Sequence, residues 1–479
     1  MDLESLDENR FLIRKDASKG MNTDVIVYSD GKMIEKIKSD RTLQQAANAT
    51  TLPALAGSIL VMPDGHEGYG FPIGGVMASY AESGFVSPGA VGFDINCGIR
   101  LIKTNLVTQD VRPKINELSD RLFKNVPSGV GSRLNIGLKP ADLSRVAEEG
   151  VEYIVDKGFG VPADTGFIEE AGCMEGADLS KVSSQARSRG LNELGTLGAG
   201  NHFLEVQRVE KILDGSIAAR FGLSDDQVVI MVHTGSRGFG HQICSDYLKI
   251  LVEYQRRQGI TLADPELSYA YVGTKEATDY LLAMKSAVNY AFVNRQIITS
   301  SIRRSFEETF GRSWDAMGME ILYDLSHNIV KLEEHKVDGK LEKLLVHRKG
   351  ATRAFSKGRP ELPRSYRETG QPVLIPGSMG TASYVLCGTE GAMKETFGSA
   401  CHGAGRVMSR HEAIRTIPAS KTFASMQSKG IAIRIRTRKL VSEEAEWTYK
   451  DIDDVVSVVQ NAGIAKAVSR NVPLAVIKG

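Results

Sequence analysis

The sequence predicts a mixed α+β fold in which residues 1–479 form a single large domain. Helical stripes and a strand-like run lie between glycine-rich clusters. Hydrophobic residues make up 42% of the chain and charged residues 24%, which is typical of a globular protein with a large buried core. A length-based prior allows about three domains. Because no repeat or low-complexity linker marks a boundary, the single domain is the preferred interpretation.

Four segments predict individual elements. Gln227–His233 is a continuous apolar run that ends in a histidine, which favours a buried strand. Ile298, Ile302, Phe306 and Phe310 recur every four residues and predict a long amphipathic helix over about 284–310. Asp453–Val468 is a further helix candidate. The segment after Gly240 also predicts a helix, because one face would carry Ile243, Tyr247, Leu248, Leu251 and Val252.

Charge and cysteine content limit the setting of the protein. The net charge is +1, so nucleic-acid binding would need a local basic face. The amino terminus is acidic, unlike a signal peptide, and no apolar run approaches transmembrane length. The cysteines are widely spaced, with no CxxC pair, which indicates a reducing compartment and argues against a disulfide framework. We therefore expect a cytoplasmic protein.

The 48 glycines gather in clusters, and several clusters adjoin histidines. Glycine lets the backbone approach a ligand closely and adopt positive φ. Such loops are therefore good places to look for a site. The clusters are residues 65–75, 89–98, 195–200, 235–240, 377–380 and 398–405.

The stretch Gly92–Arg100 (GFDINCGIR) carries the clearest chemical signal. Asp94 and Cys97 stand three residues apart between glycines. A carboxylate and a thiolate at this spacing can reach one cation, or two adjacent cations, from a single short turn. Histidines elsewhere in the chain could supply the remaining ligands.

Four of the nine histidines stand in contexts that suggest a site, although a single histidine is usually structural. His202 follows a glycine loop and Asn201, and His233 ends the predicted strand. His327 lies in the sequence DLSHN, and His402 lies in the glycine-rich loop SACHGAGR. We expect His335, His347 and His411 to be structural. The roles of His66 and His241 stay undecided.

One motif is a decoy. Lys336-Val337-Asp338-Gly339 matches the KxDG pattern of lysine-based nucleotidyltransferases, but Asp338-Gly339 between two runs is a strong hairpin signal. We favour the hairpin turn. The chain also has no GxxxxGK[ST] loop, and 235–240 has the wrong glycine order for a dinucleotide fingerprint. Any nucleotide must be held in another way.

Taken together, these motifs resemble the RtcB-type RNA ligases, a GTP- and manganese-dependent tRNA ligase family that seals RNA. The resemblance spans most of the chain and includes a penultimate lysine, Lys478. It rests on the segments that begin at Met62 (MPDGH), Gly92 (GFDINCGIR), Gly200 (GNHFLE), His233 (HTGSRG), Ser326 (SHN), His347 (HRKGATRA), Pro376 (PGSMG) and His402 (HGAGR).

The resemblance implies a role for each candidate residue. Asp94, Cys97 and His202 would hold one Mn²⁺ ion. Cys97, His233 and His327 would hold a second, so that the thiolate bridges. The ligands alone would suit zinc as readily as manganese. His402 would be the nucleophile that takes GMP from GTP.

The same resemblance implies a GTP site in which Glu205 reads guanine, because a carboxylate can accept from the N1 and N2 donors at once. Backbone amides beside His402 would contact phosphate oxygens. The implied GTP-site residues are Asn201, His202, Phe203, Leu204, Glu205, His327, Asn328, Pro376, Gly377, Ser378, Met379, Ser383, His402, Gly403, Ala404, Gly405 and Lys478.

The implied reaction joins an RNA 2′,3′-cyclic phosphate or 3′-phosphate end to a 5′-hydroxyl end through GMP-histidine and RNA-3′-diphosphoguanosine intermediates. Its setting would be tRNA splicing or RNA repair, with tRNA exon halves or broken RNA ends as partners. We also expect a monomer, and an archease-type activator is a candidate partner. Candidate RNA-backbone contacts are Arg348, Lys349, Arg353, Lys357, Arg359, Arg187, Arg189 and Arg237.

Two other functions remain open from the residues alone. A two-metal phosphodiesterase or phosphatase acting on RNA ends would use the same ligands to activate water. It would not need His402 as a nucleotide acceptor. A noncatalytic RNA-binding or metal-storage protein would need neither that nucleophile nor a carboxylate that reads guanine.

Overall fold

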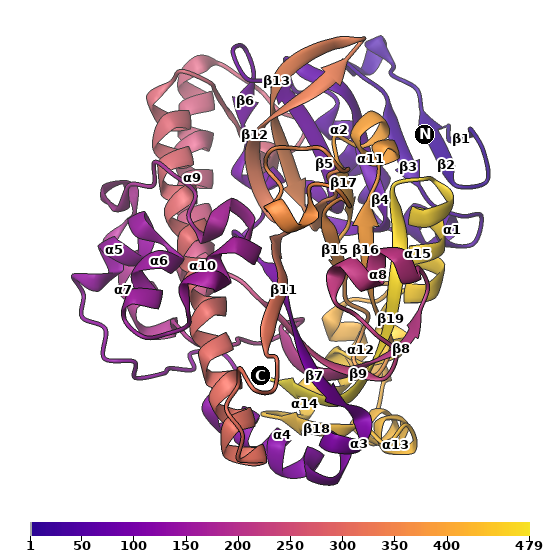
Figure 1. Cartoon of the computed structure of the whole chain (residues 1–479). Coiled ribbons are helices and arrows are strands. Elements are labelled where there is room, and N and C mark those ends of the chain that lie inside the picture. Colours follow the sequence, from indigo (N-terminus) through magenta and orange to yellow (C-terminus); the bar gives the residue numbers. More distant parts are fainter. Residues whose placement is uncertain (1) are drawn as a thin grey trace.

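The computed structural model describes residues 2–479, and two large β-sheets and a group of helices make up most of it (Figure 1). In the first sheet only β3 and β4 run parallel, and all other neighbours are antiparallel. Its strand order is β1 (Glu4–Ser5), β2 (Arg10–Ile13), β3 (Val25–Tyr28), β4 (Leu55–Tyr69), β5 (Phe71–Tyr80), β13 (Lys340–Lys349), β12 (Asn328–Val337).

The second sheet brings the end of the chain into the middle of the molecule, because the last strand pairs with β8. Along its main path neighbouring strands are antiparallel, and β18 (Ala432–Ile435) adds to β19 in parallel. The order is β11 (Glu320–Ser326), β7 (Gly98–Val107), β9 (Gln227–Thr234), β8 (Phe203–Ile212), β19 (Ala465–Lys478), β16 (Ser383–Gly388), β15 (Pro372–Ile375).

The remaining strands form two short two-stranded sheets. β6 (Phe85–Val86) pairs with β10 (Ala270–Tyr271), and β14 (Ala351–Arg353) pairs with β17 (Ser399–Cys401). The pair formed by β14 and β17 matters for function, since β17 runs directly into His402. Pairing with β14 therefore fixes the backbone that enters the His402 loop.

The two sheets share a hydrophobic core, in which Val76 and Val346 of the first sheet lie in one cluster with Ile375 and Leu386 of the second. α15 (Ile452–Asn461) contributes to the same cluster. At its β7, β9 and β8 strands, the second sheet packs against α4 (Ile115–Asn125) and α10 (Lys275–Phe310). Burying these apolar faces supplies the main driving force for bringing the sheets together.

α10 is a 36-residue helix that runs the length of the molecule beside α9 (Arg237–Gln258) (Figure 1). Thr274 caps its first turn by accepting from the Ala277 amide, and Gly311 ends it with φ +66°. Its buried face is not wholly apolar. Asn294 and Arg295 are fully buried there and donate to the carbonyls of Gly235 and Thr234, beside the site described below.

The remaining α-helices are shorter, and they pack against the two long helices, against one another or against the sheets. They are α1 (Met33–Lys38), α2 (Thr42–Ala49), α3 (Thr108–Val111), α5 (Asp142–Glu149), α6 (Val151–Asp156), α7 (Ser184–Glu193), α8 (Gly215–Phe221), α11 (Glu390–Glu395), α12 (Arg410–Thr416), α13 (Ala419–Ser428) and α14 (Arg438–Glu443). Within residues 2–479, none of the helices combines the length and apolarity needed to cross a membrane.

The mixed α+β class predicted from the sequence is confirmed, and so are the strand at 227–233 and the helix after Gly240. The long helix begins nine residues earlier than predicted. The helix predicted over Asp453–Val468 is wrong after Asn461, in nearly half of its length. α15 ends at Asn461, Gly463 turns the chain with φ +72°, and β19 begins at Ala465. That residues 1–479 form one domain stays a prediction, which the shared core supports.

Candidate active site

A cavity of about 500 Å³ opens where the ends of β7, β8, β9 and β19 meet the glycine-rich loops. Its size is within the range of small-molecule sites. Residues from segments far apart in the sequence line it. Among the lining residues are Asp94, Cys97, Asn201, Phe203, Glu205, His233, His327, Asn328, Pro376–Met379, His402–Gly405 and Lys478.

A tight turn holds Asp94 and Cys97 together at one edge of this cavity. The Cys97 amide donates to the Asp94 carbonyl at 2.9 Å, and Asn96 between them has φ +52°. Left-handed backbone is uncommon outside glycine, although asparagine tolerates it better than most residues. A Cβ on Gly235 would come within 2.6 Å of Asp94 Oδ2. The facing loop must therefore be glycine for the carboxylate to sit there.

Five side chains form two candidate metal sets that share one sulfur. Asp94, Cys97 and His202 make the first set, and Cys97, His233 and His327 make the second. Within each set, the potential ligand atoms lie within 4.8 Å of one another. Cys97 Sγ lies 3.4 Å from His202 Nε2 and 3.1 Å from His233 Nε2. These are the two sets that the sequence resemblance implied.

The chemistry of these side chains fits divalent cations. His233 Nε2 and His327 Nε2 face each other at 3.2 Å, and burial lowers the pKa of both imidazoles well below the ordinary value, so both stay neutral. Burial raises the pKa of the Cys97 thiol, but a bound cation deprotonates a coordinating thiol. Neutral imidazoles, a thiolate and a carboxylate make a donor set for a borderline divalent metal.

Arg295 holds the two ligand loops from behind. Its Nη1 donates to the carbonyls of Asn96 at 2.9 Å and Thr234 at 2.8 Å, next to Cys97 and His233 respectively. Its Nε and Nη2 face the buried carboxylate of Asp324, with Nη2 2.8 Å from Oδ1. A planar guanidinium in such a fork fixes both backbones in one geometry.

His402 stands beside the second metal set, with its ring 4.9 Å from that of His327. Its Nδ1 lies 2.5 Å from Asp64 Oδ2, and the same oxygen accepts from the amides of His402 and Gly403. A carboxylate that accepts from Nδ1 leaves the Nε2 lone pair free. The loop therefore presents an oriented imidazole nucleophile to the cavity.

Glu205 and Lys478 lie together at another wall of the cavity, because Glu205 of β8 pairs with Val476 of β19. Burial raises the pKa of Glu205 to about 7, although a bond from Gln207 Nε2 at 2.7 Å opposes the shift. Lys478 Nζ donates to the Gly200 carbonyl at 2.7 Å and to Glu444 at 3.2 Å. The Glu205 carboxyl group and the Lys478 ammonium therefore lie in the same part of the cavity wall.

Comparison with known proteins agrees with this arrangement. Residues 45–479 match the family described as tRNA-splicing ligase RtcB. The chain belongs to the RtcB family. It is 54% identical over 477 residues to the tRNA-splicing ligase RtcB of Thermococcus kodakarensis, which covers 100% of this chain and 99% of that one. It is 53% identical over 458 residues to the Pyrobaculum aerophilum protein of the same name, with 95% and 94% covered.

Three residues implied by the RtcB resemblance lie outside the cavity lining as the structure describes it. His202 is buried behind Asp94, and its Nε2 lies 2.9 Å from Asp94 Oδ2. Leu204 packs in the core on the other face of β8. Ser383 sits behind Glu205, and both side chains accept from Gln207 Nε2. Their assignment to the GTP site stays a prediction.

Some basic residues within 347–354 of this RtcB-family chain were predicted to contact the RNA backbone, and the structure shows that they are buried. Arg348 is fully buried and pairs with Glu333 at 2.7 Å, and Arg353 is buried beside Glu169 and Glu170. The prediction that these two arginines contact RNA on the surface is wrong. Lys349 lines the cavity, but its Nζ already donates to three backbone carbonyls.

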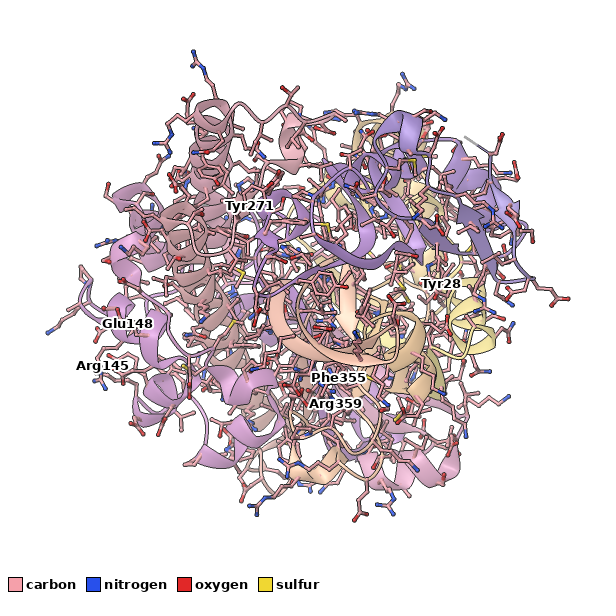
Figure 2. All side chains as sticks on the ribbon, turned by 90° about the horizontal axis from the view of Figure 1, so that it is seen from above. Tyr28, Arg145, Glu148, Tyr271, Phe355 and Arg359 are labelled. Atoms are coloured by element: carbon pink, nitrogen blue, oxygen red, sulfur yellow. The ribbon has the colours of Figure 1, made fainter. Side chains whose placement is uncertain are left out.

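The other predicted RNA contacts differ in exposure. Arg359 lies beside Phe355 (Figure 2), with its guanidinium 4.6 Å from the ring centroid. It also pairs with Glu361. Arg187 is half-buried and donates to the carbonyls of Leu179 and Val182. The remaining three are Lys357 and Arg189, which are exposed, and Arg237, which is half-buried.

The decoy and the structural histidines behave as expected. Lys336 is exposed, and the turn between β12 and β13 has φ +49° at Asp338 and +81° at Gly339, as a tight hairpin requires. His347 is fully buried, with Nδ1 bonded to the Leu345 carbonyl. His335 is buried against Glu333 at 2.9 Å.

Sequence reasoning missed Asp64 and Arg295. Asp64 lies 338 positions from His402, so no local spacing links the two residues. The available signal is a carboxylate directly before the glycine cluster that begins at Gly65. Arg295 looked like an ordinary polar position in a long helix, and only the packing of α10 against the site gives it a role.

Proposed function

We propose that this protein is a GTP-dependent RNA ligase of tRNA splicing and RNA repair. It would join a 2′,3′-cyclic phosphate or 3′-phosphate end to a 5′-hydroxyl end. The observation that carries this proposal is the place of His402, which Asp64 orients in a cavity that also holds two candidate metal sets and Glu205. Family membership supports it, since the relatives are named tRNA-splicing ligases.

In the first step, His402 Nε2 attacks the α-phosphorus of GTP. A phosphorus–nitrogen bond forms, the bond to the bridging oxygen breaks, and pyrophosphate leaves. Asp64 makes this possible because it accepts the Nδ1 hydrogen and thereby keeps the lone pair on Nε2. The same carboxylate stabilises the ring as positive charge develops on it.

Glu205 and Lys478 give a physical reason for guanine. The N1 and N2 hydrogens of guanine can donate to the Glu205 carboxylate, and the neighbouring O6 can accept from the Lys478 ammonium. Adenine would present an acceptor to the carboxylate and a donor to the ammonium. Both side chains line the cavity, so a base bound there can reach both of them, and a base with the wrong donors and acceptors would leave buried polar groups unpaired.

Asp94, Cys97 and His202 would hold one Mn²⁺ ion, and Cys97, His233 and His327 a second. When bound, such ions supply positive charge that offsets the charge on phosphate oxygens and the leaving group. The ligands suit zinc as readily, so manganese comes from the family resemblance.

The later steps pass the GMP group to RNA and then release it. The 3′-phosphate formed by opening a cyclic phosphate attacks the GMP on His402, and the histidine leaves. The 5′-hydroxyl of the second strand then attacks the activated 3′-phosphate, a phosphodiester bond forms, and GMP leaves. A monomeric state, a cytoplasmic location and an archease-type activator are further parts of the proposal.

Intact-mass measurement after incubation with GTP and manganese tests the proposal. We expect a gain equal to one GMP, which disappears in His402→Ala. His411→Ala is a matched control, since His411 is exposed and lies outside the cavity lining. No gain with any divalent metal would refute the ligase assignment and favour a two-metal hydrolase of RNA ends.

A further inference from the structure

His66 lies in β4, two residues after the Asp64 that orients His402, yet none of the steps above uses it. Its Nδ1 lies 2.9 Å from the backbone carbonyl of Asp64. A carbonyl oxygen can only accept, so Nδ1 carries the hydrogen and Nε2 keeps its lone pair. His66 is partly exposed, and its ring lines the cavity.

Asp64 therefore holds two imidazoles in the same tautomer. Its side chain accepts from Nδ1 of His402, and its main-chain carbonyl accepts from Nδ1 of His66. Lys450 holds the backbone of β4 on both sides of Asp64, because its buried Nζ donates to the carbonyls of Pro63 at 2.8 Å and Gly65 at 2.6 Å. Each imidazole keeps one free nitrogen, and a single rigid residue sets the positions of both.

His66 also stands where two cavities join. A second cavity of about 770 Å³ reaches from His66 toward α1 and α12, between Lys36 and Glu412. The two cavities share five lining residues, which are His66, Glu67, Gly68, Arg406 and Arg410. A strand that enters through the second cavity would bring its end past His66 before it reached His402.

We propose that His66 Nε2 accepts the proton of the RNA 5′-hydroxyl in the strand-joining step, an inference that rests on the proposed ligase function. The 5′-oxygen forms a bond to the 3′-phosphorus as its hydrogen passes to Nε2. The bond from that phosphorus to the GMP oxygen breaks, and GMP leaves with the electron pair. His66 then returns the proton to solvent.

The surroundings of His66 agree with this role. Burial lowers the pKa of His66 to about 4, and the charge of Lys450 acts in the same direction, whereas the bond to the Asp64 carbonyl and the Asp64 carboxylate oppose the shift, so the ring is neutral before RNA binds. The negative phosphates of the activated RNA end would also oppose the shift. Arg406, Arg410 and Glu67 also face the junction and are held constant in the test below.

His66→Asn is the decisive variant, because the asparagine amide can still donate to the Asp64 carbonyl but offers no group that takes up a proton. The substrate is RNA that already carries the 3′-diphosphoguanosine, so that the joining step alone is timed. We expect joining to slow by about 10²–10⁴-fold, the usual contribution of a general base. Guanylylation of His402 by GTP should be unchanged.

The pH profile and chemical rescue separate proton transfer from positioning. In the wild type the joining rate should rise with pH through the pKa of His66, which is about 4 in the free protein and is raised beside the RNA phosphates, and His66→Asn should lose this limb. Added imidazole should restore joining in His66→Ala. His411→Asn, exposed and outside both cavities, controls for replacement of a histidine.

Two results would overturn the inference. Joining by His66→Asn at the wild-type rate would show that another group takes the proton. Equal losses in guanylylation and joining would show that His66 acts through Asp64 and His402. Failure of the ligase assignment itself is distinguishable, because the wild type would then form no GMP adduct.

Discussion

GTP should bind this protein more weakly as the pH falls, because Glu205 must be ionised to accept from guanine. Burial raises the pKa of Glu205 to about 7, so the carboxyl group is protonated in much of the empty protein at neutral pH. The protonated form would present a hydrogen toward the donors of the base. Each binding event must therefore remove that proton, and binding loses free energy as the pH drops through 7.

The size of the effect follows from linkage. With a pKa of about 7 in the free protein and an ionised group in the complex, the apparent Kd at pH 6 is about tenfold higher than at pH 8. This corresponds to about 1.4 kcal/mol. Above pH 8 the affinity should level off, since Glu205 is then fully ionised.

A fluorescence titration with a labelled GTP analogue between pH 5.5 and 8.5 measures this slope. Glu205→Gln is the control, because it keeps the shape of the side chain and removes the titrating group, although it also weakens binding. The γ-phosphate of GTP titrates in the same range, and its contribution is common to both proteins. A wild-type slope equal to that of Glu205→Gln would refute the reasoning.

Three further changes test the metal sets, the support behind them and the decoy. Cys97→Ser should remove both cations and abolish guanylylation, because a hard hydroxyl replaces the shared thiolate. Two ions found by elemental analysis in this variant would contradict the bridging role. Arg295→Lys should lower the free energy of unfolding by about 3 kcal/mol, since an ammonium cannot satisfy all the groups to which the guanidinium donates. Denaturant titration measures this loss of stability, and Arg304→Lys at an exposed position of the same helix is the control. Lys336→Ala should leave guanylylation unchanged, and a large loss would restore the KxDG interpretation.

The sequence predicted elements well where a long apolar pattern ran without interruption. The strand at 227–233 is buried at every position, and such a run is easy to recognise. The error at Asp453–Val468 has a clear local cause. The apolar positions continue past Asn461, but Gly463 takes up the left-handed conformation that ends α15, and the same kind of residues then alternate along β19.

In the candidate site, too, residues close together in the sequence could be predicted, whereas contacts between distant segments could not. Asp94 and Cys97 belong to one turn, and the resemblance supplied three histidines that the structure brings to the same sulfur. The bond between Asp64 and His402 joins β4 to a loop 338 residues away. It depends on the pairing of β14 with β17 and on the packing of the two sheets, which no motif in either segment encodes.

The buried arginines near 347–354 help to hold the segment that leads into His402. Arg348 donates to Ser399 Oγ and to the Phe397 carbonyl, so it ties β13 to the strand that leads into His402. Its charge is balanced by Glu333, and removing either partner would leave an uncompensated buried charge. These cations therefore stabilise the His402 loop from one side while Asp64 holds the imidazole from the other. Because the net charge is only +1 and these cations are used inside the fold, attraction of RNA falls to exposed basic residues such as Arg410, which lines both cavities, and Lys36 of the second cavity.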